Sequence, residues 1–336
     1  MRRGIILSLA AMLCVMPHAD PSRRLQPKSA ADISMNASEP STGEVAIPFE
    51  YFKQHIYLPV ALQGKLGFIF MLDSDASRNI LNLRTARQLG LHPGNMEPEK
   101  NVGFGYERIY VAPEENVSVE LGAVPMAHTL SVMDLNKFEL HFSHVTDGML
   151  GYPFFLHHVV KVDFQTKLVS IYSADRYVYR GFGIKVRSVP GKGSIVVRVT
   201  LASDRHRSHR LDVIVDTGSN VSLLLYKNFL RTLDLEQNLR QSVPAKAFGL
   251  NGYYQIQQGT VDSLQIGDVE TRNPTVDFLE KNEDLSPNRN VPGAIGNGVL
   301  QGFRSVTFDL PHHRVIFELP GAAPDPTVVL KTTMSP

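Results

Sequence analysis

The chain has 336 residues, of which 43% are apolar and 20% are charged, and its formal net charge is +1. This length suits two domains that each bury a core of their own, and the balance of residue types is that of an ordinary globular protein. The near-zero net charge gives no indication of nucleic-acid binding, and no basic amphipathic stripe indicates a membrane surface.

The N-terminus has the layout of a secretory signal peptide. Arg2 and Arg3 precede an apolar stretch from Gly4 to Met16, and the small residue Ala19 follows shortly after it. A stretch of about 13 residues is too short to span a bilayer comfortably. We therefore predict that residues 1–19 are a signal peptide, and that the product is a soluble bacterial protein of the periplasm or the medium, without stable membrane insertion. A buried helix and a retained membrane anchor are the alternatives.

Two segments outside the expected core have the composition of flexible chain. Residues 20–46 are rich in Pro, Ser, Ala and charge and show little periodicity, so we predict a flexible linker there. Residues 320–336 carry further prolines and are interpreted as a flexible tail. The only cysteine, Cys14, lies in the predicted signal peptide, so the mature protein has neither a disulfide nor a thiol nucleophile.

Between these segments one pattern of predicted elements occurs twice. Apolar residues alternate from His55 onward, a polar turn follows, and a second apolar strand ends at Asp73. A helical stretch from Leu83 to Leu89 comes next and stops at Gly90, a natural C-terminal cap. The second copy repeats this order from Gly193, and its second strand ends at Asp216.

The two copies stay in register farther along the chain. Asp73 and Asp216 are 143 residues apart, whereas Asp163 and Asp309 are 146 residues apart. A tandem duplication explains this near-constant spacing. Many short strands, glycine-rich turns and few helices predict an all-β fold of two homologous β-barrel or β-sandwich lobes, 47–174 and 180–319, related by a pseudo-twofold axis.

Asp216, Thr217 and Gly218 after an apolar strand resemble the active-site loop of aspartic proteases, the pepsin and retropepsin superfamily. In that family an apolar-apolar-glycine segment packs beneath the loop, and here Gly293–Leu300 begins 77 residues after Asp216. The first copy has Gly148–Phe155 in the corresponding place. The resemblance covers roughly residues 47–319 and implies a bilobal, monomeric endopeptidase that acts on peptide or protein substrates without a cofactor.

The resemblance also implies the roles of the two aspartates. Asp73 and Asp216 would face each other around one water and share a proton, because two carboxylates so close cannot both ionise. The ionised carboxylate would take a proton from the water, and the protonated one would polarise the scissile carbonyl. A turn-forming aspartate at a strand end is the alternative for Asp216.

The neighbouring residues are expected to support the loops. Gly218 allows close approach and offers its N–H to a carboxylate. In the family, the hydroxyl at the position of Thr217 donates across to the partner loop, and Ser74 keeps a hydroxyl at the corresponding position of the first copy. Ser219 is expected to donate to the outer oxygen of Asp216.

The first copy departs from the family pattern at Asp75, which stands where the glycine is expected. Aspartate tolerates a left-handed backbone less freely than glycine, and it adds a third carboxylate close to the pair. Three consequences are open: Asp75 raises the pKa values of the pair, distorts the loop, or points away.

Glycine-containing hairpins between the motifs are candidates for the flaps that cover substrate in this family. They are Asn101–Val111 and Ala247–Gln257, with Tyr106 and Tyr253 as the expected substrate-facing residues. A surface hairpin with half-buried tyrosines is the alternative. No His, Cys, Asp and Glu spacing of a metal site occurs, and the basic segment Ser203–Arg210 is interpreted as a solvated hairpin tip or, alternatively, a docking site for an acidic partner.

Three functions remain open on the sequence. The favoured one is an exported endopeptidase with an Asp73–Asp216 dyad inside one chain. The second is a degenerate homologue that binds extended peptides by strand addition without cleaving them, which Asp75 favours. The third is a homodimer that pairs two Asp216 loops across chains, which the closely matched copies disfavour.

Overall fold

The computed structural model describes residues 44–99, 107–122, 124–125, 129–190, 193–204, 207–232, 235, 240–279 and 291–321. These residues are mostly in β-strands with a few short helices, which confirms the all-β prediction. None of the helices in this part of the chain has the length and apolar character needed to cross a membrane. The predicted signal peptide and most of the predicted tail lie outside the described residues.

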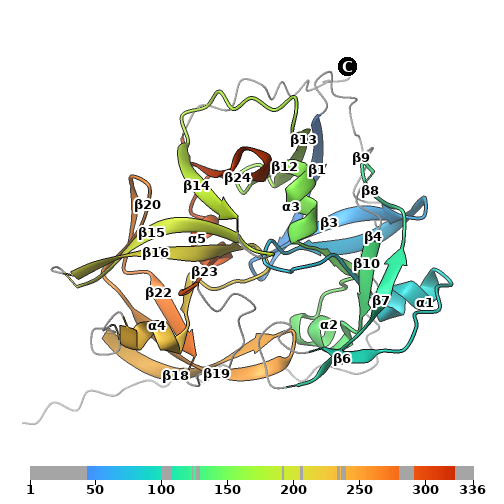
Figure 1. Ribbon diagram of the computed structural model, residues 1–336, viewed down its shortest axis with the longest axis horizontal. Coiled ribbons are helices and arrows are strands. Elements are labelled where there is room, and N and C mark those ends of the chain that lie inside the picture. The colour runs from blue at the N-terminus through green and yellow to red at the C-terminus, as the bar shows by residue number, and fades with distance from the viewer. Residues whose placement is uncertain are drawn as a thin grey trace, which may run out of the picture.

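The described strands form two sheets, one of 15 strands and one of 10, drawn in Figure 1. The larger sheet runs in the order β1 (Glu44–Pro48), β13 (Leu168–Ser173), β12 (His158–Asp163), β24 (Ser305–Asp309), β25 (Arg314–Glu318), β14 (Ile184–Pro190), β15 (Ile195–Asp204), β16 (Arg207–Asp216), β23 (Gly293–Gly296), β17 (Leu223–Leu225), β22 (Thr275–Leu279), β19 (Gly252–Thr260) and β18 (Arg240–Gly249), with β20 (Ser263–Ile266) on β15 and β21 (Val269–Arg272) on β20.

The smaller sheet contains strands from the first half of the sequence alone. Its order is β6 (Glu97–Glu99), β7 (Ile109–Asn116), β10 (Thr129–Met133), β5 (Ile80–Asn82), β11 (Gly148–Leu150), β4 (Lys65–Leu72), β3 (His55–Leu62), β8 (Val119–Leu121) and β9 (Val124–Pro125), with β2 (Glu50–Phe52) on β3. The helices are α1 (Leu83–Gln88), α2 (Asn136–Phe142), α3 (Tyr152–His157), α4 (Lys227–Thr232), α5 (Asn297–Leu300) and the 3-10 helix η2 (Leu310–His312).

The sheets are open, so the expectation that each lobe closes into a β-barrel is wrong. A barrel requires the last strand of a sheet to pair with the first. Here the strand paths among the described residues have free ends, and β1, β12 and β13 leave the first half of the sequence to join β24 and β25 of the second half. In Figure 1 these shared strands lie above the other two groups of strands.

Two local predictions can be compared directly with the structure. Helix α1 ends where the sequence indicated, with Leu89 as its cap and Gly90 at a φ of 78°, in the left-handed region that glycine adopts freely. The predicted linker reached residue 46, but β1 already begins at Glu44 and pairs with β13. Backbone pairing to a buried strand therefore orders three residues that composition alone assigned to the linker.

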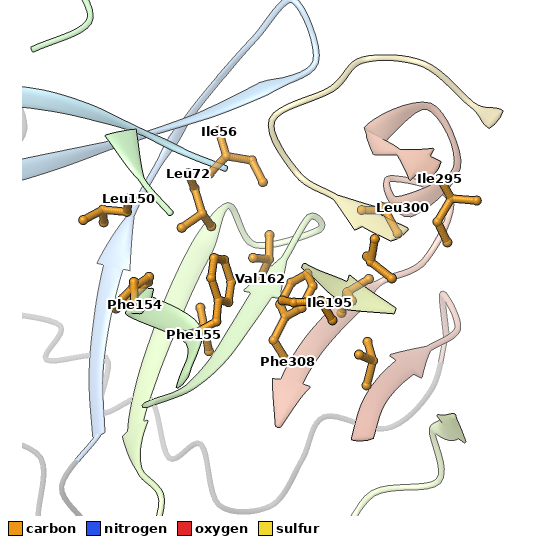
Figure 2. Close-up of a cluster of buried hydrophobic side chains, with 14 of the residues drawn as sticks. Ile56, Leu72, Leu150, Phe154, Phe155, Val162, Ile195, Ile295, Leu300 and Phe308 are labelled. Carbon is orange, nitrogen blue, oxygen red and sulfur yellow. The ribbon is translucent and has the colours of Figure 1, made fainter. Parts of the chain in front are cut away.

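The largest core joins the two halves of the chain. Phe155 of α3 and Phe308 of β24 meet edge to face with ring centroids 4.9 Å apart, and Figure 2 shows them between side chains from both halves. Burying an aromatic side chain of this size contributes roughly 1.5–3 kcal/mol. Because Leu72 and Val215 belong to this same core, it fixes the ends of β4 and β16 against each other.

Candidate functional site

The site is built where β4 and β16 end. Asp73 follows β4, which pairs in parallel with β11, and Asp216 closes β16, which pairs in parallel with β23. The two turns face each other, and the carboxyl groups of Asp73 and Asp216 lie within hydrogen-bonding reach. The structure therefore brings together, within one chain, the two aspartates that the sequence singled out.

The residue after each aspartate joins the two turns through reciprocal hydrogen bonds. The N–H of Ser74 donates to Oγ1 of Thr217 over 3.0 Å, and the N–H of Thr217 donates to Oγ of Ser74 over 2.9 Å. Each hydroxyl in turn donates to a carbonyl of the opposite strand, Ser74 to Val215 over 2.6 Å and Thr217 to Leu72 over 3.0 Å. Both side chains are buried, so these bonds hold the turns without competition from water.

The downstream glycine segments pack beneath the turns, as the sequence predicted. A Cβ atom on Gly151 would lie 2.5 Å from the carbonyl oxygen of Ala76, and one on Gly296 would lie 2.7 Å from that of Ser219. The residue after each glycine donates its N–H to the same carbonyl, at 2.7 and 2.8 Å. Glycine is needed at both positions because the backbones touch.

Gly218 is required for space rather than for an unusual backbone. Its φ lies outside the left-handed region, but a Cβ atom on it would lie 2.3 Å from Cγ of Asp73. Its N–H donates to Oδ1 of Asp216 over 2.8 Å, as expected. The absence of a side chain at this position is thus what lets the carboxyl group of Asp73 approach the second turn.

Asp75 keeps the backbone role of the glycine and turns its side chain aside. Its N–H donates to Oδ1 of Asp73 over 3.1 Å, and the N–H of Ala76 donates to the same atom over 3.0 Å. The carboxylate of Asp75 accepts a hydrogen bond of 2.6 Å from the hydroxyl of Ser194. The backbone of Asp75 is not left-handed, so replacing the glycine by aspartate does not strain the turn.

Burial raises the pKa values of all three carboxyl groups. For Asp216 the rise is large, and the charges of Asp73 and Asp75 add to it. Burial also raises the pKa of Asp73, although the N–H groups of Ala76 and Asp75 and the hydrogen bond with Asp216 oppose the rise. Burial raises the pKa of Asp75 to about 7 against the effect of Ser194, with a further contribution from Asp73. The pair therefore retains a proton at pH values where an isolated carboxyl group is ionised.

Ser219 does not take the predicted part. Its hydroxyl accepts the N–H of Val221 over 3.4 Å, and among the described residues we find no hydrogen bond from it to Asp216. Serine hydroxyls often bond to backbone groups a short way along their own chain, and this local bond is the one that forms here.

A cavity of about 700 Å³ opens over the two carboxyl groups. Side chains from both halves of the sequence line it. They include Met71, Ile80, Met133, Phe138 and Phe142 from the first half, and Val221, Leu224, Tyr226, Tyr254 and Ile256 from the second. Polar residues such as Arg78, Glu99 and Lys246 also line it, so the cavity offers both apolar and polar surface to an organic ligand.

The hairpin of β18 and β19 extends beside the cavity and reaches helix α2 of the other half (Figure 1). The ring of Phe248 stacks on His141 with centroids 3.8 Å apart, and the hydroxyl of Tyr253 lies 3.2 Å from Nδ1 of the same histidine. The N–H of Glu107 also donates to the carbonyl of Asn251 over 2.9 Å. Tyr253, predicted as a substrate-facing residue, lines the cavity and is 58% exposed.

The other flap candidate is described only in part. Strands β6 and β7 pair antiparallel, with Glu97 opposite Val111, so they form the base of a hairpin. Tyr106 lies outside the described residues, as does the rest of 100–106.

Sequence analysis missed residues that contact the turns from neighbouring strands. His55 begins β3 and lies buried at the cavity, and burial lowers its pKa to about 4 although the backbones of Lys53 and Gly218 oppose this shift. Ser194 precedes β15 and reaches Asp75. His55 and Ser194 have corresponding places at β3 and β15, the strands that pair with β4 and β16, so a residue-by-residue alignment of the copies would have drawn attention to both.

Asn297 is a further residue that the sequence did not single out. Its Nδ2 donates to the carbonyls of Gln54 and Thr217, both over 2.7 Å, so it ties the second turn to the first half of the chain. No group of three or more His, Cys, Asp or Glu side chains in the described part is arranged to hold a metal ion. No family model matches the chain, and no curated protein matches it.

Proposed function

We propose that the protein is an aspartic endopeptidase with Asp73 and Asp216 as its catalytic dyad. One observation carries the proposal: two partly buried carboxyl groups meet on turns that are held together by reciprocal hydrogen bonds, at the base of a cavity. The intrachain approach of Asp73 and Asp216 supports a single-chain enzyme over a homodimer, and we propose a monomer.

The arrangement is suited to activating a water between the carboxyl groups. Because the pKa values of both are raised, the pair holds one proton over a wide pH range. The ionised carboxylate accepts a proton from the water as that water attacks the peptide carbonyl, and the protonated one donates to the carbonyl oxygen. The proton taken from the water then passes to the leaving nitrogen, the other carboxylate takes a proton from a hydroxyl of the intermediate, and the C–N bond breaks.

The finer architecture that we propose is a bilobal one, with homologous lobes over 47–174 and 180–319. Support comes from the pairing of β12 with β24, where Val160 lies opposite Phe308 and Val162 opposite Val306. With the copies 146 residues apart, Val160 corresponds to Val306 and Val162 corresponds to Phe308. A twofold rotation that exchanges the copies therefore turns one of these pairs into the other. Such self-complementary pairing is what a pseudo-twofold axis through the shared sheet requires.

The proposed substrate is an extended segment of a peptide or protein. The cavity above the carboxyl groups lies between strands of both halves, and the β18–β19 hairpin borders it. Backbone groups at the strand edges can form hydrogen bonds with an extended substrate. The side chains of the substrate can then pack against the apolar residues on either side of the cavity. We further propose that the protein works outside the cytoplasm, in the periplasm or the medium, on the ground of its predicted signal peptide.

A second candidate function follows from Asp75. A third carboxylate with a raised pKa beside the pair is not part of the family pattern, and its charge also raises the pKa of Asp216. A protein that holds peptides without cleaving them remains the alternative on this observation.

The deciding experiment is turnover of a broad peptide library by the wild type and by Asp216→Ala. We expect the wild type to cleave a subset of peptides with an acidic pH optimum, and Asp216→Ala to cleave none. If both proteins bind peptides of the library and neither releases products, the binding function is favoured. Equal cleavage by both proteins would exclude Asp216 from the chemistry.

A further inference from the structure

Apolar and charged residues line both sides of the cavity, but their charged groups are compensated differently. On the side of the first half, Met71, Ile80, Met133, Phe138 and Phe142 belong to one apolar cluster. On the side of the second half, the apolar residues are accompanied by Asp277 and Gln258, which also line the cavity. On the first side the charged residues Arg78 and Glu99 pair with each other, whereas on the second side Asp277 has no cationic partner among the described residues.

Asp277 is held in the middle of the sheet that forms the second wall. It belongs to β22, where it lies opposite Leu224 of β17 and Gln258 of β19. Nε2 of Gln258 donates to its Oδ1 over 2.8 Å, and the residue is only 7% exposed. In the first half, Ser131 has the corresponding place opposite Ile80, so a carboxylate is not required by this kind of strand pairing.

Lys246 and Arg78 line the same cavity as Asp277, but no cationic side chain among the described residues pairs with it. None of the ion pairs among the described residues includes it, and Gln258 is the one side chain in that part of the chain that we find donating to it. A buried carboxylate with a single amide donor is poorly compensated for its lost hydration. Accordingly, burial raises its pKa, and the hydrogen bond from Gln258 opposes this rise. A cation that enters the cavity would remove this penalty.

Asp277 is also at a suitable distance from the carboxyl pair. Strands β16, β23, β17 and β22 lie side by side, so Asp277 is three strands from Asp216. At a strand spacing of about 4.8 Å this is roughly 14 Å along the sheet. Tyr254 lies near both: burial raises the pKa of its hydroxyl, and the charges of Asp277 and Asp216 raise it further. A long side chain beside the reacting bond covers only part of this distance, and the side chain of Asp277, which itself lines the cavity, and the contact between the two groups cover the rest.

We infer that Asp277 forms a subsite that binds the ammonium or guanidinium group of a substrate lysine or arginine next to the scissile bond. The inference rests on the proposed function and specifies its substrate class. A peptide would place a large apolar side chain against the wall formed by the first half and a basic side chain against Asp277. Lysine and arginine suit this place because their long stems can follow the apolar side chains of Leu224 and Ile256 while the charged group reaches the carboxylate.

The test compares pairs of peptides that differ only beside the bond found to be cleaved in the library. One member carries lysine there and the other carries methionine, which has a similar length and no charge. The ratio of their kcat/KM values is measured for the wild type, for Asp277→Asn and for Asp277→Ser. Serine is chosen because Ser131 occupies the corresponding position in the first half. Asp268→Asn removes one exposed negative charge from the turn between β20 and β21 and is the matched control.

We expect the wild type and Asp268→Asn to favour the lysine peptide at least tenfold, and both Asp277 variants to bring the ratio close to one. A wild type without a preference for lysine, or an Asp277 variant that keeps it, overturns the inference. Norleucine and acetyl-lysine peptides repeat the comparison on the wild type alone, so the test does not depend on the folding of the variants.

Failure of the proposed function can be distinguished from failure of this inference. If the wild type cleaves no peptide, the same pairs are tested for binding by fluorescence anisotropy. Tighter binding of the lysine peptide by the wild type than by Asp277→Asn would still support the subsite, although the enzyme proposal had failed. Equal binding by the two proteins would overturn the subsite as well.

Discussion

The turn after β4 and the turn after β16 have matching contacts but different third residues. In both, an aspartate is followed by a buried hydroxyl that accepts an N–H and donates to a carbonyl of the opposite strand. In both, the N–H of the third residue donates to Oδ1 of the aspartate of its own turn, from Asp75 over 3.1 Å and from Gly218 over 2.8 Å. The shared contacts use backbone groups, the two hydroxyls and the carboxyl groups of the aspartates, and none uses the side chain of the third residue.

The difference between the turns lies in the space beside each carboxyl group. At Gly218 a Cβ atom would meet the carboxyl carbon of Asp73 at 2.3 Å, whereas Asp75 carries a whole side chain. Asp75 is accommodated because its carboxylate turns to Ser194, at the start of a neighbouring strand. The comparison teaches that the backbone of the first turn survives the loss of its glycine, while the electrostatics around Asp216 change.

The largest effect that we expect comes from removing the charge of either aspartate. Asp73→Asn and Asp216→Asn should each lower kcat/KM on a cleaved peptide by at least about 10³-fold, because one carboxyl group cannot serve as both base and acid. Equal losses would show that the turns contribute equally despite Asp75. Measured activity of Asp268→Asn is the control for a surface aspartate. Full activity in Asp73→Asn would defeat the intrachain dyad and leave the homodimer.

A smaller effect is expected from the hydroxyls that join the turns. Ser74→Ala and Thr217→Val each leave a buried N–H without its acceptor and a buried carbonyl without its donor, so each should lower the free energy of unfolding by about 1–3 kcal/mol. Because the two hydroxyls share one network, the double variant should lose less than the sum of the single losses. Urea denaturation of the three variants measures this.

The control for the hydroxyl variants is Ser118→Ala, whose hydroxyl is at the surface and makes a hydrogen bond of 3.5 Å to Glu120. We expect its stability to equal that of the wild type within about 0.5 kcal/mol. Unchanged stability in Thr217→Val would contradict the role assigned to the hydroxyls. A loss in only one of the single variants would show that the turns are held unequally.

Much of the site could be predicted because it depends on local rules that a repeat makes visible. Apolar strands ending at Asp73 and Asp216, and glycines spaced behind them, need only periodicity and a comparison of the copies. The close approach of Gly218 likewise follows from the family pattern. The same reasoning failed for Ser219, because the choice between a carboxylate and the N–H of Val221 depends on a rotamer that the pattern does not specify.

The long-range parts of the fold were less accessible. Barrel closure was expected from many short strands, but strands of both halves share one sheet, and such pairing depends on contacts more than a hundred residues apart. The direction of the Asp75 side chain was left open for the same reason, since its partner Ser194 belongs to the other copy. The contact of Phe248 with His141 also joins distant segments, and no sequence signal indicated it.

The smallest effect is expected from Asp75, the third residue of the turn after β4. Asp75→Gly should shift the alkaline limb of the pH–activity profile to lower pH, because the charge of Asp75 raises the pKa of Asp216 and its loss makes the shared proton easier to remove. Asp75→Asn should shift the limb in the same direction, since it also removes the charge. Profiles of kcat/KM between pH 3 and 8, conditions chosen to cover both limbs, measure the shift. An unmoved limb in both variants would mean that Asp75 does not influence the pair.

The stability of the same variants gives a second measurement with a defined sign. The folded protein raises the pKa of Asp75 from 3.8 to about 7, so it binds this proton more tightly than the unfolded chain does. The contribution of Asp75 to the free energy of unfolding is therefore fully present below pH 3.8 and falls as the pH rises toward 7. Asp75→Gly should make the decline across this window shallower. Ser194→Ala should extend the decline to higher pH, because Ser194 lowers the pKa of Asp75 and its loss raises the folded-state value further. Reading the slope with pH, rather than stability at one pH, separates the charge from the constant entropic cost of a new glycine. A slope that is the same in Asp75→Gly as in the wild type would assign the pH dependence to Asp73 and Asp216 alone.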